Sequence, residues 1–209
     1  MSGIKYYDGS TFKDSEIKYY DGGKWVECSP SYFSTKWESS TTSGATTYTK
    51  TWNASWSQAY DEDNSKRDTD YLYQGWNGTS YHGSQRSLIG FDTGAIKKEL
   101  EGATITSCTV KFYSKHTWWN SGGIYRVGYH NHSSIPSSFS HTVGYKHDVE
   151  GGKPSWCSFT SKALAEGIRD GVYKGISLFC GTSKDQTYYG YVTTHSSSTP
   201  PTITVTYTK

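Results

Sequence analysis

The sequence contains no long apolar run and little charge of either sign. Hydrophobic residues make up 33% of its 209 residues and charged residues 19%, and the formal net charge is only +2. No stretch approaches the ~20 apolar residues that a membrane-spanning helix needs. A net charge this small, without a basic run, gives no reason to expect nucleic acid. We therefore expect neither a membrane nor a nucleic acid among the partners.

Other absences concern export and cofactors. The N-terminal residues MSGIKYYDG lack the apolar segment of a signal peptide, which predicts synthesis in a cytoplasm. The cysteines Cys28, Cys108, Cys157 and Cys180 do not have the spacing of metal ligands. Buried free thiols are the simplest interpretation, and a disulfide stays open because spacing does not define its geometry. We expect no cofactor.

Aromatic residues are what the chain has in abundance. They make up 16% of the sequence, with 19 Tyr and 8 Trp. Large rings bury enough area for a chain with few aliphatic residues to fold. Together with frequent Ser, Thr and Gly, they are typical of an all-β protein.

The first residues repeat themselves. Ile4–Gly9 (IKYYDG) matches Ile17–Gly22, and Phe12 then matches Trp25. Each copy joins two short β-rich runs through Asp-Gly, a strong hairpin signal because both turn residues take positive φ. We predict two small hairpins in tandem over residues 1–28, each of which would be marginally stable alone.

The aromatic positions of these hairpins are predicted to form a surface that docks onto a partner. The alternative is that both hairpins fold back and pack on the rest of the chain. In the first interpretation, residues 1–28 anchor the protein in a larger particle. The predicted docking residues are Tyr6, Tyr7, Phe12, Tyr19, Tyr20 and Trp25.

The rest of the chain is predicted to be a linker and one β-rich domain. Ser, Thr, Gly and Pro dominate residues 29–45, where hydrophobic periodicity fades. About nine runs within residues 46–209 alternate with period two between turn-rich segments. In TITVTY, for example, Ile203, Val205 and Tyr207 share one face. This pattern predicts an antiparallel two-sheet β-sandwich of the jelly-roll kind.

Two short helices are predicted within this sandwich. DTGAIKKELEG has Asp92 or Thr93 as a possible N-cap and Gly102 as its stop. SKALAEGIRDG has Ser161 as its cap and ends at Gly171. We expect both helices to close an end of the sandwich.

Several motifs follow one another along the chain, namely RSLIGFD, a helical turn, GATITSCTVKFYSK, then TSKALAEGIRDGVYKGISLF and a final PPTITVTY. The order of these motifs resembles the DNRLRE-type jelly-roll family. The resemblance covers residues 46–209 in pieces. It implies a jelly-roll sandwich for this part of the chain.

The chain also contains the phrases YTKTWNASWSQAY, DYLYQGW, HTWWNSGG and TVTYTK, and it has short tandem aromatic repeats with Asp-Gly near its N-terminus. Together with the expected sandwich, these features resemble minor structural proteins of tailed bacteriophages. The resemblance implies a virion component of the tail, neck, baseplate or head, assembled in the bacterial host cytoplasm. It implies other virion proteins as partners through the N-terminal repeats and leaves a homo-oligomer open. It brings no motif-matched catalytic residues.

The segment KHTWWNSGG offers a candidate glycan site. Sandwich modules bind glycans by stacking sugar rings on exposed aromatic side chains, while polar groups address the hydroxyls. The alternative is that these rings cap the end of the core. The candidate residues are Trp118, Trp119, Asn120, His130 and His132, with His116 expected nearby.

Metal sites have weaker support. His130 and His132 would share one strand face, but a third ligand is not evident. Asp61, Glu62 and Asp63 could offer oxygens to calcium, but they lack an EF-hand pattern and fit a solvated turn. We therefore predict no metal site.

Hydrolytic sites also lack a supporting pattern. The acidic residues are scattered through turns instead of being paired as in glycosidases. Asp148 and Glu150, near His147, are assigned to a loop, and no G-x-S-x-G motif is present.

We predict a non-enzymatic structural or host-recognition protein of a phage particle, which could contact host cell-wall glycans. The alternative is a non-catalytic carbohydrate-binding module of a bacterial protein.

Overall fold

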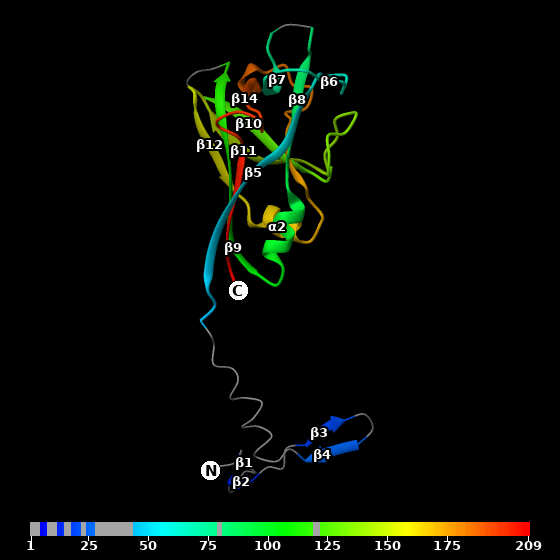
Figure 1. The fold of residues 1–209 in the computed structure, drawn as a ribbon, viewed down its shortest axis with the longest axis vertical. Coiled ribbons are helices and arrows are strands. Elements are labelled where there is room, and N and C mark those ends of the chain that lie inside the picture. The colour runs from blue at the N-terminus through cyan, green and yellow to red at the C-terminus, as the bar shows by residue number, and fades with distance from the viewer. Residues whose placement is uncertain are drawn as a thin grey trace. The chain divides into compact units, whose positions relative to one another are not determined.

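The computed structural model of the protein describes residues 44–78, 81–118 and 122–209, together with the backbone of four short strands between residues 5 and 27. The chain divides into two units, residues 1–45 and residues 46–209 (Figure 1). Each unit pairs its strands within itself.

The first unit contains two tandem β-hairpins, as the repeat predicts. Strand β1 (Lys5–Tyr7) pairs with β2 (Phe12–Asp14), and β3 (Lys18–Asp21) pairs with β4 (Lys24–Glu27). The register is equivalent in both copies, because Tyr7 is opposite Phe12 and Tyr20 is opposite Trp25. In the second hairpin Asp21, which the sequence assigns to an Asp-Gly turn, is the last residue of β3 and pairs with Lys24.

The second unit is all-β and sandwich-like, with two short helices, and its strand pairs are antiparallel. The helices are α2 (Thr93–Leu100) and α3 (Lys162–Arg169), and a 3-10 turn η1 covers Gln186–Tyr188. The strands are β5 (Thr47–Tyr60), β6 (Lys66–Arg67), β7 (Tyr71–Trp76), β8 (Ser84–Phe91), β9 (Thr104–Thr117), β10 (Gly123–His130), β11 (Val143–Gly151), β12 (Ser155–Thr160), β13 (Gly175–Leu178), β14 (Gly190–Thr193) and β15 (Thr202–Thr208).

The long strand β5 takes part in two sets of pairings. Its first half pairs with β15, where Trp52 is opposite Ile203, and its second half pairs with β8, where Ser57 is opposite Ile89. Strands β13, β10 and β11 continue the pairing from β8, whereas β9 continues it from β15. In Figure 1, β5 crosses the unit obliquely as it passes from one set to the other.

Along one of its edges, strand β9 pairs with two strands one after the other, β14 and then β15. Ser114 pairs with Ser155 of β12 on one side and with Val192 of β14 on the other. Further along the edge that β14 occupies, Lys111 pairs with Thr202 of β15. Residues 194–201, which join β14 to β15, therefore leave the sheet. Strand β5 separates from β15 at the same level. This break in the sheet positions the candidate site.

Alternation along the strands builds the core. In β15 the predicted inward residues Ile203, Val205 and Tyr207 are fully buried. Thr204 and Thr206 lie on the other face, where their hydroxyls hydrogen bond to those of two Thr residues of β5 at 2.8 and 3.0 Å. Burial of one face and hydroxyl pairing on the other fix the register of this strand, because a one-residue slip would reverse both faces.

The helices begin where the sequence predicts. The Asp92 side chain accepts a hydrogen bond from Ala95 N, and the Ser161 side chain accepts one from Leu164 N. Each cap satisfies a backbone N–H that a helix start leaves without an intrahelical partner. The two helices contact each other and lie toward the end of the unit that holds the C-terminus (Figure 1).

One predicted loop is a strand. The segment with His147, Asp148 and Glu150 forms most of β11, and Asp148 is opposite Arg126 of β10. Most of its side chains are exposed or half-buried, and Val149 is the clearest inward residue. An exposed edge strand has few apolar positions, so its sequence resembles that of a loop.

The cysteines and the surface agree with the composition. Cys108, Cys157 and Cys180 are buried free thiols, whereas Cys28 lies outside the described residues. Burial raises the pKa of Cys108 to about 12, so this thiol stays protonated at neutral pH.

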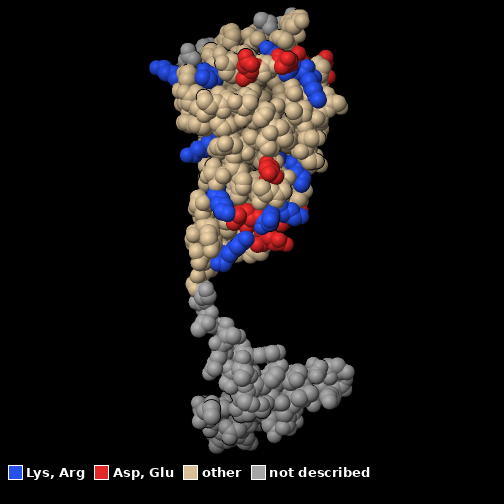
Figure 2. Space-filling view, in the orientation of Figure 1, with Lys and Arg blue, Asp and Glu red and all other residues tan. Residues whose placement is uncertain are grey.

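Figure 2 shows charged side chains gathered toward the two ends of the second unit on the face in view, with few between them. No helix within the described ranges has the length and hydropathy of a membrane span.

Candidate functional site

A polar cavity opens where β14 and β15 separate. Its volume is ≈ 550 Å³, which is within the ~300–1,000 Å³ range of small-molecule sites. Seventeen residues line it, and only Ala59 and Leu72 among them lack a polar side chain. Such sites are usually lined by apolar and aromatic groups. This cavity therefore suits a ligand rich in hydroxyl groups better than an apolar one.

The loop over the cavity is held by its own hydroxyl groups. The Thr193 hydroxyl donates to the carbonyl of Thr199 at 2.5 Å, and Thr199 N donates to the Ser197 hydroxyl at 3.1 Å. Ser197 N in turn donates to Thr194 O at 3.3 Å. A loop that satisfies its own backbone groups keeps its shape without a ligand.

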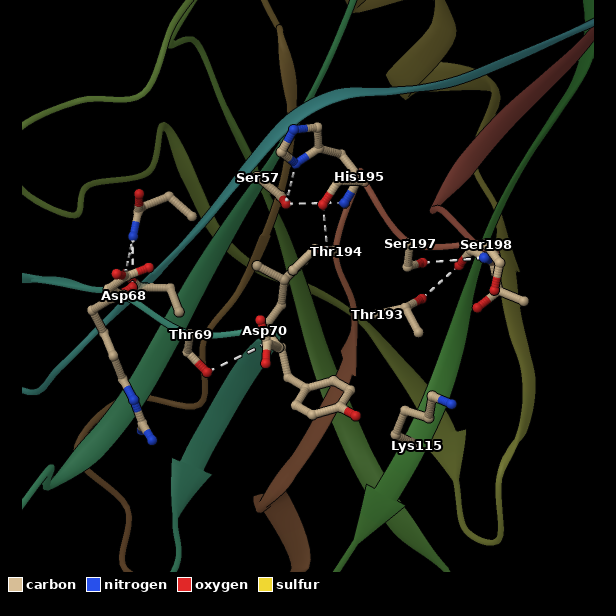
Figure 3. A pocket seen from close by; sticks show the side chains of 17 residues that line it. Ser57, Asp68, Thr69, Asp70, Lys115, Thr193, Thr194, His195, Ser197 and Ser198 are labelled. Atoms are coloured by element: carbon tan, nitrogen blue, oxygen red, sulfur yellow. Dashed lines mark hydrogen bonds between the residues drawn. The ribbon is translucent and has the colours of Figure 1, made fainter.

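Ser57 and His195 fasten this loop to β5. The Ser57 hydroxyl accepts a hydrogen bond from His195 N at 3.1 Å and lies 2.9 Å from His195 Nδ1 (Figure 3). Both contacts of the hydroxyl thus come from one residue of the loop. In a serine nucleophile, by contrast, the hydroxyl is presented to substrate by an imidazole that a third group orients. The geometry of Ser57 and His195 therefore fits a pair that holds the loop on β5 and not a nucleophile with its base.

The charges around the cavity balance. Arg67 and Lys115 supply two cations, and Asp68 and Asp70 supply two carboxylates. In Figure 3, Asp68 lies on one side of the cavity and Lys115 on the other. Arg67 is already engaged, because its guanidinium lies 4.3 Å from the centre of the Tyr73 ring and bonds to Gln85. A cavity with this balance offers no strong attraction to phosphate.

A row of partly exposed rings extends from the cavity across three strands. This aromatic row consists of Tyr71 and Tyr73 on β7, Tyr191 on β14 and His116 on β9. The Tyr191 ring lies 4.9 Å from Tyr71, 5.2 Å from Tyr73 and 5.4 Å from His116 between ring centres. Tyr191 is directly opposite both Tyr73 and His116 in the sheet, so the row follows from strand register. Tyr71 also lines the cavity, which makes the row continuous with it.

The aromatic row continues to the Trp118 loop. The buried ring of Tyr189 lies 6.2 Å from His116 and 6.2 Å from Trp118 between ring centres. Trp118 is 40% exposed, so it presents ring surface to solvent. The structure thus connects the predicted residue Trp118 to a cavity that the sequence did not reveal.

Tyr125 supports the row from the core. Its buried hydroxyl lies 3.0 Å from His116 O and 3.2 Å from Tyr191 O, and 2.8 Å from the Ser114 hydroxyl. These groups surround the register shift between β14 and β9. Desolvation raises the pKa of Tyr125, so its hydroxyl remains a donor. This side chain therefore fixes the backbone that carries two rings of the row.

The structure does not bring His130 and His132 to Trp118. His130 is at the opposite end of β10 from Gly123, about 23 Å away for seven residues of extended strand. Its ring is fully buried, Nε2 donates to Ile89 O at 3.0 Å, and Nδ1 accepts from His132 N at 3.2 Å. The predicted pair of histidines therefore packs in a separate place, with their ring centres 5.5 Å apart. Trp119 and Asn120 lie outside the described residues.

The predicted docking residues belong to strands of which only the backbone is described. The register of β1–β4 includes all six of them, namely Tyr6, Tyr7, Phe12, Tyr19, Tyr20 and Trp25. Their role as a docking surface stays a prediction.

The acidic turn lines a second hollow of ≈ 350 Å³, with Asp61, Glu62, Asp63 and His82 among its residues. His82 Nδ1 lies 3.0 Å from an Asp61 carboxylate oxygen, and Asp63 accepts hydrogen bonds from Ser65. The Ser65 hydroxyl and backbone hold the pKa of Asp63 below its ordinary value. Over residues 44–78, 81–118 and 122–209, no group of three or more His, Cys, Asp or Glu is arranged to hold a metal ion.

Sequence reasoning missed Tyr71, Tyr73 and Tyr191. The Tyr-x-Tyr spacing of β7 places both rings on one strand face, which was the available signal. The pairing of β7 with β14 could not be obtained from this spacing. No protein-family model matches the sequence, and no curated protein is significantly similar to it.

Proposed function

We propose that the chain is a non-enzymatic structural component of a bacteriophage virion, in the tail, neck, baseplate or head. Its N-terminal hairpins attach it to other virion proteins, and residues 46–209 present a surface that contacts host glycans. The observation that carries this proposal is the pair of hairpins with equivalent register in a unit of their own.

Isolated two-stranded hairpins are marginal in water, which is why they need a surface to cover them. Among the described strands, neither hairpin pairs with a strand of residues 46–209. The equivalent pairs Tyr7–Phe12 and Tyr20–Trp25 would give a partner two similar sites to bind. Two linked sites bind more tightly than one, because the second association is intramolecular.

The use of polar groups in the second unit supports a non-enzymatic role. Ser57 and His195 hold a loop, and Arg67 is engaged by an aromatic ring and by Gln85. His130, which is buried with both ring nitrogens hydrogen bonded, is unsuited to proton transfer with a substrate.

The alternative function is a non-catalytic carbohydrate-binding module of a bacterial protein. The aromatic row beside the polar cavity favours it, because carbohydrate recognition needs both ring faces and hydroxyl partners. In this alternative the hairpins do not attach the chain to a virion.

Mass spectrometry of purified particles separates the two functions. Particles would be purified by density gradient from a lysate in which the chain is expressed, with host cytoplasmic proteins as a contamination control. We expect the chain to be present at a fixed ratio to the major capsid protein. If the chain is abundant in the lysate and absent from the particles, the virion role is wrong.

A further inference from the structure

We infer that the polar cavity and the aromatic row together form one binding site for a neutral oligosaccharide. One sugar unit occupies the cavity, and the following units stack along the row toward Trp118. This inference deepens the proposed function and rests on its assignment of glycan contact to residues 46–209.

The rings of the row supply stacking surface. Tyr71, Tyr191 and His116 are half-buried, so each has one side supported by the sheet and another open to solvent. Tyr73 is also half-buried, but the Arg67 guanidinium already lies over its ring. The apolar C–H face of a pyranose ring packs on such an aromatic face and gains buried area there. Adjacent strands are ~4.8 Å apart, so the path from β7 through β14 to β9 extends ~10 Å. That length fits more than one sugar unit.

The cavity supplies hydrogen-bonding groups at one end of the row. Asp68 and Asp70 are exposed, and neither carboxylate bonds to another described side chain. Carboxylates accept two hydrogen bonds from adjacent hydroxyls, which is the arrangement that a sugar ring offers. Ser196, Ser198 and Lys115 add exposed donors around the same space.

The charge balance selects a neutral ligand. Two cations face two carboxylates, and one of the cations, Arg67, already lies over Tyr73. A polyanion would meet Asp68 and Asp70 without a surplus of positive charge. A second copy of the chain is the other occupant that could cover partly exposed rings, but it would not use a cavity lined by hydroxyl groups.

The site can be tested with the full-length chain by isothermal titration calorimetry. The probes are cellohexaose, maltohexaose and hexa-N-acetylchitohexaose, with polygalacturonate as a charged comparison. We expect binding to at least one of the neutral hexasaccharides and none to polygalacturonate. Failure of all three to bind, or binding of polygalacturonate alone, would overturn the inference.

Variants locate the binding. Tyr191→Ala should weaken binding by about 10- to 100-fold, the range expected for loss of a central stacking residue. Asp70→Asn, an exposed change that keeps the fold, should weaken it by about tenfold. Trp156→Ala is the matched control, because Trp156 is 51% exposed on β12 and its ring packs on Tyr113 instead of the row. If Trp156→Ala weakens binding as much as the other two variants, the site lies elsewhere.

Two further measurements keep the outcomes distinct. Sedimentation velocity of the native chain and of Tyr191→Ala shows whether the row joins copies of the chain, and a loss of dimer in the variant would overturn the glycan site. A chain that is present in particles and binds no hexasaccharide would overturn the site but leave the virion role standing. A chain that binds through the row and is absent from particles would support the site and favour the carbohydrate-binding module.

Discussion

At the scale of single residues, burial determines the charge of His130. Desolvation lowers the pKa of this ring from 6.5 to about 4, and Nδ1 is already occupied by the N–H of His132. An unfolded chain takes up this proton near pH 6.5. The stability that the neutral ring contributes is therefore complete above about pH 6.5 and is lost as the pH falls toward 4.

Urea unfolding at pH 7 and at pH 4.5 tests this linkage. Between these values the native chain should lose about 2 to 3 kcal/mol more unfolding free energy than His130→Gln, in which the side chain does not titrate. Glutamine keeps one donor and one acceptor, and the remaining histidines contribute to both proteins. An equal loss in the two proteins would show that His130 is protonated as easily in the folded chain.

Tyr125 is a second residue with a measurable role. Tyr125→Phe should lower the free energy of unfolding by about 1–3 kcal/mol, because the buried hydroxyl of Ser114 loses its partner. The double variant Tyr125→Phe/Ser114→Ala should recover part of that loss, since it removes the unsatisfied group. A double-mutant cycle by chemical denaturation measures the coupling. Additive single effects would contradict this account.

At the scale of elements, the two helix caps differ in their surroundings. Ser161 is buried, and besides capping α3 its hydroxyl bonds to the Tyr129 hydroxyl at 2.7 Å. Asp92 caps α2 from an exposed position. Ser161→Ala should therefore cost about 2 kcal/mol of stability and Asp92→Ala about 1 kcal/mol. Equal losses in denaturant titrations would mean that the Tyr129 contact adds nothing.

At the scale of the whole molecule, the core and the hairpins belong to different parts of the chain. The buried core cluster lies within residues 54–207. Deletion of residues 1–28 should leave the melting temperature of the second unit almost unchanged, measured by circular dichroism. The same deletion should abolish incorporation into particles, measured by immunoblot of purified particles.

Each other outcome of this deletion has a definite meaning. If the shortened chain is still incorporated, the hairpins are not the anchor. If it becomes insoluble or melts much earlier, the hairpins pack on the core, and the folding-back alternative is the correct one. The deletion removes both the length of the N-terminal segment and its aromatic residues. A chain with Tyr7→Ser and Tyr20→Ser is the control for length, because it changes the side chains and retains the whole segment.

The sequence by itself determined the elements whose signals are local. Alternation with period two identified segments that form β5, β10 and β12, and in β12 the pattern is local and simple, because Cys157 and Phe159 are buried and their neighbours are exposed. Cap residues located both helices, because a cap acts within three residues. The repeat predicted the two hairpins, although it assigned Asp21 to a turn and this residue pairs with Lys24 within the second hairpin.

Only the tertiary structure decided which segments meet. Strand β11 was missed, because an exposed edge strand needs few apolar residues and its pairing with β10 carries no local signal. In the sequence, nothing distinguishes His130 from an exposed histidine that binds a ligand. In the structure, neighbouring residues of β8 and β13 bury it. The aromatic row joins Tyr71 and Tyr191, which are distant in sequence and adjacent only through the pairing of β7 with β14. Local patterns determine which face of a strand is buried, whereas a site made from several strands depends on long-range pairing.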